Sequence, residues 1–229
     1  MIFLSLSAGS TLFGSASENT DFRNPDVFPD SLRERQILYN GILWKNSFNR
    51  FVGDQFLFTN IFLPGTVGFN GKTFKNILIR YDIYSDEIMI PRNLDQIIRL
   101  NKEMVESFSF VFENKSYKFI KVSSDSLNDP KGYVNVLYEG RSALYVKYRK
   151  DIFTEVTSES DGKFYQVYTI YFMKEGVAFP VKGLKDICRI LENERVKIRE
   201  FVKVNKLKLT RKVPESFVPV IRYYDSLNK

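Results

Sequence analysis

Residues 66–81, TVGFNGKTFKNILIRY, contain the pattern that decides the fold, because Asn70-Gly71 stands between two runs of apolar and β-branched residues. Asn-Gly in this setting indicates a β-hairpin, since a type I′ turn needs positive φ at both central residues. The same dipeptide stands at Asn40-Gly41, between QILY and ILWK. We therefore expect one hairpin at each Asn-Gly.

Three further pairs of short alternating runs follow, each pair separated by a few turn-forming residues. The pairs are Phe108–Phe112 with Tyr117–Lys121, Tyr133–Tyr138 with Ala143–Tyr148, and Phe164–Phe172 with Val177–Val181. The 21 Phe and 13 Tyr also favour half-buried pleated surfaces. We expect an antiparallel meander that forms a barrel or a sandwich, because a large flat sheet would leave an apolar face open.

After Val181 the apolar period changes from that of a strand to that of a helix. Leu184, Ile187, Cys188 and Leu191 fall at i, i+3, i+4 and i+7, and Ile198, Phe201 and Val202 continue the pattern. Pro214 can open a third helix over 215–227, with Pro219 near its first turn. The fold class expected is mainly β (α+β): a β domain over 35–181 and a C-terminal cap of two or three helices over 182–229.

The composition lacks the residues on which many catalytic sites depend. The chain has no His, which is the commonest general base and the commonest metal ligand, and its single Cys has no second thiol to pair with. Helical spacing places Cys188 between Leu184 and Leu191, so we expect it in the core. We expect neither enzymatic activity nor a bound cofactor or metal.

Positive charge is concentrated in the last fifth of the chain. Residues 182–229 hold 13 Lys and Arg against 6 Asp and Glu, and the residues before them are neutral overall. The basic residues expected to contact a partner are Lys197, Lys203, Lys206, Lys208, Arg211 and Lys212. Acidic protein loops or anionic lipid headgroups would suit them, and the alternative is an ordinary solvated helix face.

The start of the chain resembles an export signal. Residues 2–13 are apolar and small and run into Gly14-Ser15-Ala16, a cleavage-like site. We expect residues 1–16 to be a signal peptide and 17–34 an extended linker, which places the protein in the periplasm and argues against nucleic acid as a partner. The alternative for 1–16 is a buried first strand. No stretch has the length of a transmembrane helix.

Three carboxylates lie within six residues at Asp82, Asp86 and Glu87. Such a group could form an acid pair or part of a calcium site. Ser85-Asp86 is also a good turn, and Asp82 alternates with core-facing neighbours as a pleated strand requires. We therefore expect a structural role for this segment.

The turn and helix motifs together resemble an uncharacterised exported, β-rich family of Bacteroidota. The resemblance covers about 39–227 and rests on Leu63-Pro-Gly-Thr-Val67, Asn70-Gly71-Lys72, Ile79–Ile88, Gly183–Ile187, Lys197–Lys203 and Lys206-Leu-Lys208. It implies a periplasmic accessory subunit of an outer-membrane assembly, such as the plug of the type 9 secretion translocon. It carries no catalytic residue to transfer.

Two functions follow as hypotheses. The first is a non-enzymatic periplasmic interaction subunit, bound to an outer-membrane β-barrel complex. The second is a ligand-binding β-barrel or sandwich, in which Tyr and Phe line a cavity for a glycan or a lipid.

Overall fold

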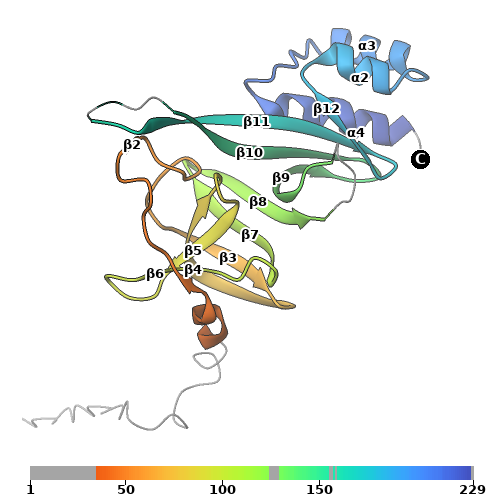
Figure 1. Ribbon diagram of the computed structural model, residues 1–229. Helices are drawn as coiled ribbons and strands as arrows, with labels where there is room; N and C mark the ends of the chain where they lie inside the picture. Colours follow the sequence, from red (N-terminus) through yellow and green to blue (C-terminus); the bar gives the residue numbers. More distant parts are fainter. Residues whose placement is uncertain (1–34, 124–128, 155–156, 158, 228–229) are drawn as a thin grey trace, which may run out of the picture. The chain divides into compact units, whose positions relative to one another are not determined.

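A computed structural model of the chain describes residues 35–123, 129–154, 157 and 159–227 (Figure 1). The chain divides into two units, Met1–Gln36 and Ile37–Lys229, and the second unit holds the elements described below. The expected signal peptide over 1–16, its alternative as a first strand and the linker over 17–34 lie outside the described residues.

The unit from Ile37 is mainly β, as expected. Within the described residues, twelve strands form one sheet in the order β1-β6-β5-β4-β3-β7-β8-β9-β10-β11-β12, and β2 pairs in parallel with β11. The strands are β1 (Ile42–Leu43), β2 (Phe51–Val52), β3 (Leu63–Phe69), β4 (Lys72–Asp82), β5 (Glu87–Pro91), β6 (Ile97–Arg99), β7 (Val105–Phe112), β8 (Lys115–Val122), β9 (Gly132–Glu139), β10 (Ala143–Phe153), β11 (Gly162–Lys174) and β12 (Val177–Val181).

The sheet is open, because its order ends at β1 and β12 and these two strands do not pair with each other. It nevertheless curls. The backbone N–H of Lys150 in β10 donates to the carbonyl of Ile83, just after β4, at 3.2 Å, although four strands separate β4 from β10 in the sheet order. The sequence left open whether the strands form a barrel or a sandwich. The structure shows a single open sheet that coils on itself.

Aromatic rings fill the interior of this coil. Phe108 and Phe119 stack with their centroids 4.7 Å apart, and Tyr81 and Tyr133 meet Phe108 edge-on at 4.9 and 5.2 Å. All four side chains are buried. Offset and edge-on ring pairs stabilise the folded state by more than the burial of their apolar area alone. Part of the high aromatic content of the sequence is therefore used to pack the core.

Four of the five expected hairpins are confirmed. Asn70 and Gly71 adopt φ of 50° and 74° and join β3 to β4. The pairs β7–β8, β9–β10 and β11–β12 are antiparallel neighbours, as the alternating runs predict.

The prediction of a hairpin at Asn40-Gly41 is wrong. Ile37–Asn40 is a 3-10 helix, η2, and β1 pairs with β6 through Ile42 opposite Arg99. Gly41 approaches the carbonyl oxygen of Arg99 so closely that any Cβ would overlap it. The glycine is needed for this close approach to β6, a long-range contact that the local pattern does not reveal.

The helical cap is confirmed. It comprises α2 (Leu184–Ile190), α3 (Arg195–Val204), the 3-10 helix η3 (Pro214–Phe217) and α4 (Val218–Leu227), with Pro219 in the first turn of α4. Its buried stripe includes Cys188, which is 3% exposed as expected. The helix α2 contacts β12, and α4 contacts β9 and β10 (Figure 1).

The carboxylate of Asp225 fastens α4 to the turn between β9 and β10. It accepts hydrogen bonds from the backbone N–H of Ser142 at 3.1 Å, the hydroxyl of Ser142 at 2.7 Å and the hydroxyl of Tyr138 at 3.0 Å. The cap is thereby attached to the sheet by polar contacts as well as by its apolar stripe. Among the described helices, none has both the length and the apolar character that a membrane crossing requires.

Candidate functional site

The acidic segment that the sequence singled out is built into the fold. Asp86 lies in the turn between β4 and β5, where it accepts hydrogen bonds from the hydroxyl of Tyr81 at 2.6 Å and from Nζ of Lys147 at 2.8 Å. Nζ of Lys102 lies 3.1 Å from its other oxygen. The side chains of Asp86 and Lys147 are each only 18% exposed.

The neighbourhood of Asp86 is shaped to hold a carboxylate. A Cβ at position 132 would overlap Oδ2 of Asp86, and Gly132 also has a positive φ of 79°, so glycine is required there on both counts. Burial by itself would raise the pKa of Asp86, but the charge and hydrogen bond of Lys147, with Tyr81 and Lys102, hold the pKa below its ordinary value. Asp86 is therefore ionised and fully engaged at neutral pH.

The other two carboxylates have separate structural partners. Asp82 is buried and accepts the backbone N–H groups of Tyr84 at 2.8 Å and Ser85 at 2.9 Å. Burial raises its pKa, against the effect of these hydrogen bonds. Glu87 pairs with Arg99 at 3.0 Å. Across the part of the chain that is described, no group of three or more Cys, Asp or Glu could hold a metal ion. This geometry favours the structural interpretation of the segment.

The basic residues that the sequence selected divide into two kinds. Lys197 and Lys203 lie on α3, and Lys206, Lys208 and Lys212 lie on the segment that follows it; all five are exposed. We call these five residues the cap lysines.

Arg211 differs from the cap lysines, because it attaches the cap segment to β11. Its Nη2 donates to the backbone carbonyl of Tyr168 at 2.8 Å, and its guanidinium lies 5.5 Å from the centre of the Tyr168 ring. The hydroxyl of Tyr168 donates in turn to the carbonyl of Arg211 at 2.7 Å. Arg211 therefore contributes to the attachment of the cap as well as to its charge.

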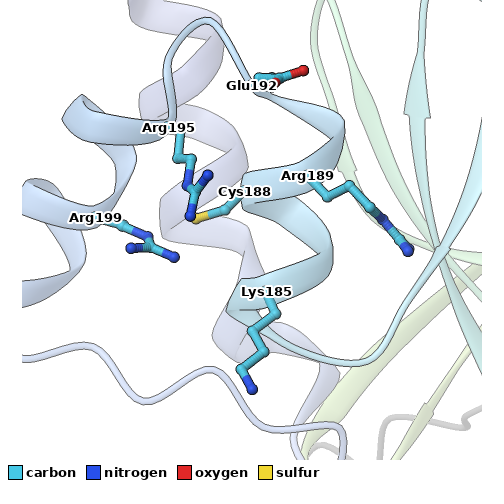
Figure 2. Close-up of a pocket in the computed structure, with 6 residues that line it drawn as sticks. All are labelled: Lys185, Cys188, Arg189, Glu192, Arg195 and Arg199. Carbon is cyan, nitrogen blue, oxygen red and sulfur yellow. The ribbon is translucent and has the colours of Figure 1, made fainter.

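A second basic group lies between α2 and α3, and the sequence analysis did not select it. A pocket of about 400 Å³ lies there (Figure 2). We call it the arginine pocket; its lining residues are Lys185, Cys188, Arg189, Glu192, Arg195 and Arg199.

Helical spacing explains why these side chains share a pocket. Lys185 and Arg189 are four residues apart on α2, and Arg195 and Arg199 are four residues apart on α3, so each pair occupies one face of its helix. In Figure 2 the two arginines of α3 extend toward α2, where the sulfur of Cys188 lies. Lys197 is about 200° around the helix from Arg195 and therefore faces elsewhere.

Most of the charge in the arginine pocket is uncompensated. Arg189 pairs with Asp186 at 3.3 Å. The side chains of Lys185, Arg195 and Arg199 form no ion pair or hydrogen bond with any residue that the structure describes. Basic residues at i, i+4 on two consecutive helices, on either side of a buried Cys, are the sequence pattern that could have identified this pocket.

Comparisons with protein-family models, with curated proteins and with solved structures found no match to this chain. The function proposed below therefore depends on the amino-acid sequence and on the contacts, burial and charge of the described residues.

Proposed function

We propose that the chain is a non-enzymatic interaction protein whose helical cap contacts an acidic surface of a protein partner. One observation carries the proposal: the cap lysines are all exposed, on a cap that Asp225 and Arg211 fasten to the sheet. A charged surface that is held in place complements an opposite surface with little loss of conformational freedom, which favours both the rate and the specificity of association.

The proposed absence of catalysis is supported by the way in which the acidic residues are used. Asp82, Asp86 and Glu87 each accept hydrogen bonds or pair with a cation of the fold. A general acid or base must be within reach of a substrate, whereas these carboxylates are committed to the turn between β4 and β5. In this proposal the three carboxylates therefore have a structural role, in joining strands, and no catalytic role.

The proposed partner is a protein of an outer-membrane assembly, and the proposed location is the periplasm, where the chain would serve as an accessory or plug subunit. The support is the resemblance to an exported family of Bacteroidota and the signal-like start over 1–16. Anionic lipid headgroups near the assembly would reinforce the contact, since each basic residue near such a surface adds to binding.

The alternative of a cavity for a glycan or a lipid has less support. It requires Tyr and Phe side chains to line a hollow, but Tyr81, Phe108, Phe119 and Tyr133 pack on one another and are buried. These rings fill the interior themselves.

Charge reversal tests the proposal. In one variant Lys203, Lys206 and Lys208 are replaced by Glu; in a matched control Lys45, Lys131 and Lys163, which are exposed on the β part of the chain, are replaced by Glu. The two variants have the same net charge. The tagged proteins are cross-linked in native envelopes and the captured partner is quantified.

We expect the cap variant to lose the partner and the control to retain it. The captured amount of wild type should also fall as ionic strength rises above about 0.15 M, because exposed charges are screened. Equal capture by the two variants, or capture that is insensitive to salt, would contradict the proposal.

A further inference from the structure

The arginine pocket brings like charges together on two adjacent helices. Four cations and one carboxylate line it; Arg189 pairs with Asp186, so the cations that remain unpaired within the described residues are Lys185, Arg195 and Arg199. Cations at i, i+4 on one helix repel each other. Arg195 is also the first residue of α3, where the helix dipole disfavours a cation; the acidic residue at this end of the helix is the N-cap, Glu194.

We propose that the arginine pocket binds an anion that carries two phosphoryl groups. A phosphoryl group bears about −1.5 to −2 charges at neutral pH, so two of them match the charge of the three unpaired cations. The volume of about 400 Å³ is of the size that small-ligand pockets have. The ligand class is therefore a diphosphate or bisphosphate.

The lining residues have different roles in binding the phosphoryl groups. Arg195 and Arg199 extend from α3 toward α2 (Figure 2), and the planar fork of a guanidinium matches two oxygens of one phosphoryl group. Lys185 adds a compact charge from α2. Glu192 extends away from the two arginines in Figure 2, so its carboxylate does not lie between them and the ligand.

This site goes beyond the proposed function and does not depend on it. The partner contact is assigned to the cap lysines, whereas the pocket is lined by other side chains. Either assignment can fail without the other.

A diphosphate could come from a soluble compound or from a lipid headgroup, and the two sources share the chemistry that the pocket recognises. Titration calorimetry on the full chain separates them. One arm uses inorganic pyrophosphate at constant ionic strength. The other uses phosphatidylcholine vesicles with and without a diphosphate-bearing lipid.

Two double variants with the same loss of charge are compared. Arg195→Gln with Arg199→Gln changes the pocket, and Lys203→Gln with Lys206→Gln changes the cap lysines. Because charge-assisted bidentate contacts are lost, the arginine variant should bind at least about tenfold more weakly than wild type, while the lysine variant should bind as wild type does. Circular dichroism checks that both variants are folded.

Saturable binding of pyrophosphate that only the arginine variant loses supports the site with a soluble ligand. Saturable binding to the diphosphate-bearing vesicles alone, lost in the same variant, supports it with a lipid ligand. Equal weakening in both variants would mean unspecific attraction and would overturn the proposal, as would the absence of saturable binding in both arms. The arginine variant can also be tested in the envelope cross-linking experiment. If it loses the protein partner there, and wild type binds no phosphoryl compound, the pocket is a protein contact and the phosphoryl proposal is wrong.

Discussion

At Asp86, one carboxylate joins segments that are far apart in the chain. Tyr81 lies five residues before it, and Lys147 lies 61 residues after it. Nζ of Lys147 also donates to the carbonyl of Tyr133 at 3.1 Å, so the network links the turn after β4 with β9 and β10. Removing one partner of a buried ion pair is costly, because the remaining charge stays buried without compensation.

The substitution Asp86→Asn should lower the free energy of unfolding at pH 7 by about 3 kcal/mol. Chemical denaturation monitored by circular dichroism measures this. Glu139→Gln is the control, because the pair of Glu139 with Lys118 is largely exposed and such pairs contribute about 0–1 kcal/mol. Similar losses for the two variants would contradict the role assigned to Asp86.

The stability difference between wild type and Asp86→Asn should depend on pH. The pKa of Asp86 is lower in the folded protein than in the unfolded chain, so its contribution is complete above the unfolded value of about 3.9. It is lost as the pH falls through the folded pKa. Denaturation at a series of pH values should show a constant difference above about pH 5 that shrinks in acid. A difference that grows in acid would refute this assignment.

At the scale of elements, Asp225 makes the hydrogen bonds that join α4 to the turn between β9 and β10, beside the apolar contacts of Val220 and Ile221. Replacing Asp225 by Ala removes the acceptor of three hydrogen bonds and leaves the backbone N–H of Ser142 without its partner. We expect a loss of about 2 kcal/mol, with faster amide exchange in α4 than in β7 and β8. Hydrogen exchange with mass spectrometry measures both regions.

Ser226→Ala is the matched control for Asp225→Ala. The hydroxyl of Ser226 donates only to the carbonyl of Tyr223 within the same helix, so this change should leave the exchange of α4 almost unaffected. Exchange that rises equally in both variants would mean that α4 is not held through Asp225.

Element by element, the sequence predicted what depends on near neighbours. The turn at Asn70-Gly71 needs only local backbone geometry, and the stripe that buries Cys188 needs only helical spacing. At Asn40-Gly41 the same dipeptide gave a wrong prediction of a hairpin. There η2 precedes β1, and β1 pairs with β6, more than fifty residues further on. The difference between the two sites is a tertiary contact, which no local pattern contains.

At the scale of the whole unit, the sheet and the cap share one core. The buried cluster includes Phe172 and Val181 from the sheet together with Ile187, Ile198 and Phe217 from the cap. Elements that bury their apolar faces against each other lose that burial together, so unfolding should be cooperative.

The single Trp provides the measurement, because Trp44 lies beside Arg80, in the sheet part of the chain. Its fluorescence and the helical circular dichroism signal should follow the same thermal transition. Loss of the helical signal at a lower temperature than the fluorescence change would indicate that the cap unfolds by itself.

The amino-acid sequence by itself determined the fold class, four of the five hairpins, the helices of the cap and the concentration of positive charge in it. These properties depend on residues within a few positions of one another and on composition. The tertiary structure alone decided the strand order, the open coil of the sheet and the pairing of Asp86 with Lys102 and Lys147. The physical reason is that each of these depends on which distant segments bury their apolar faces together, and burial brings side chains into contact without regard to their separation along the chain.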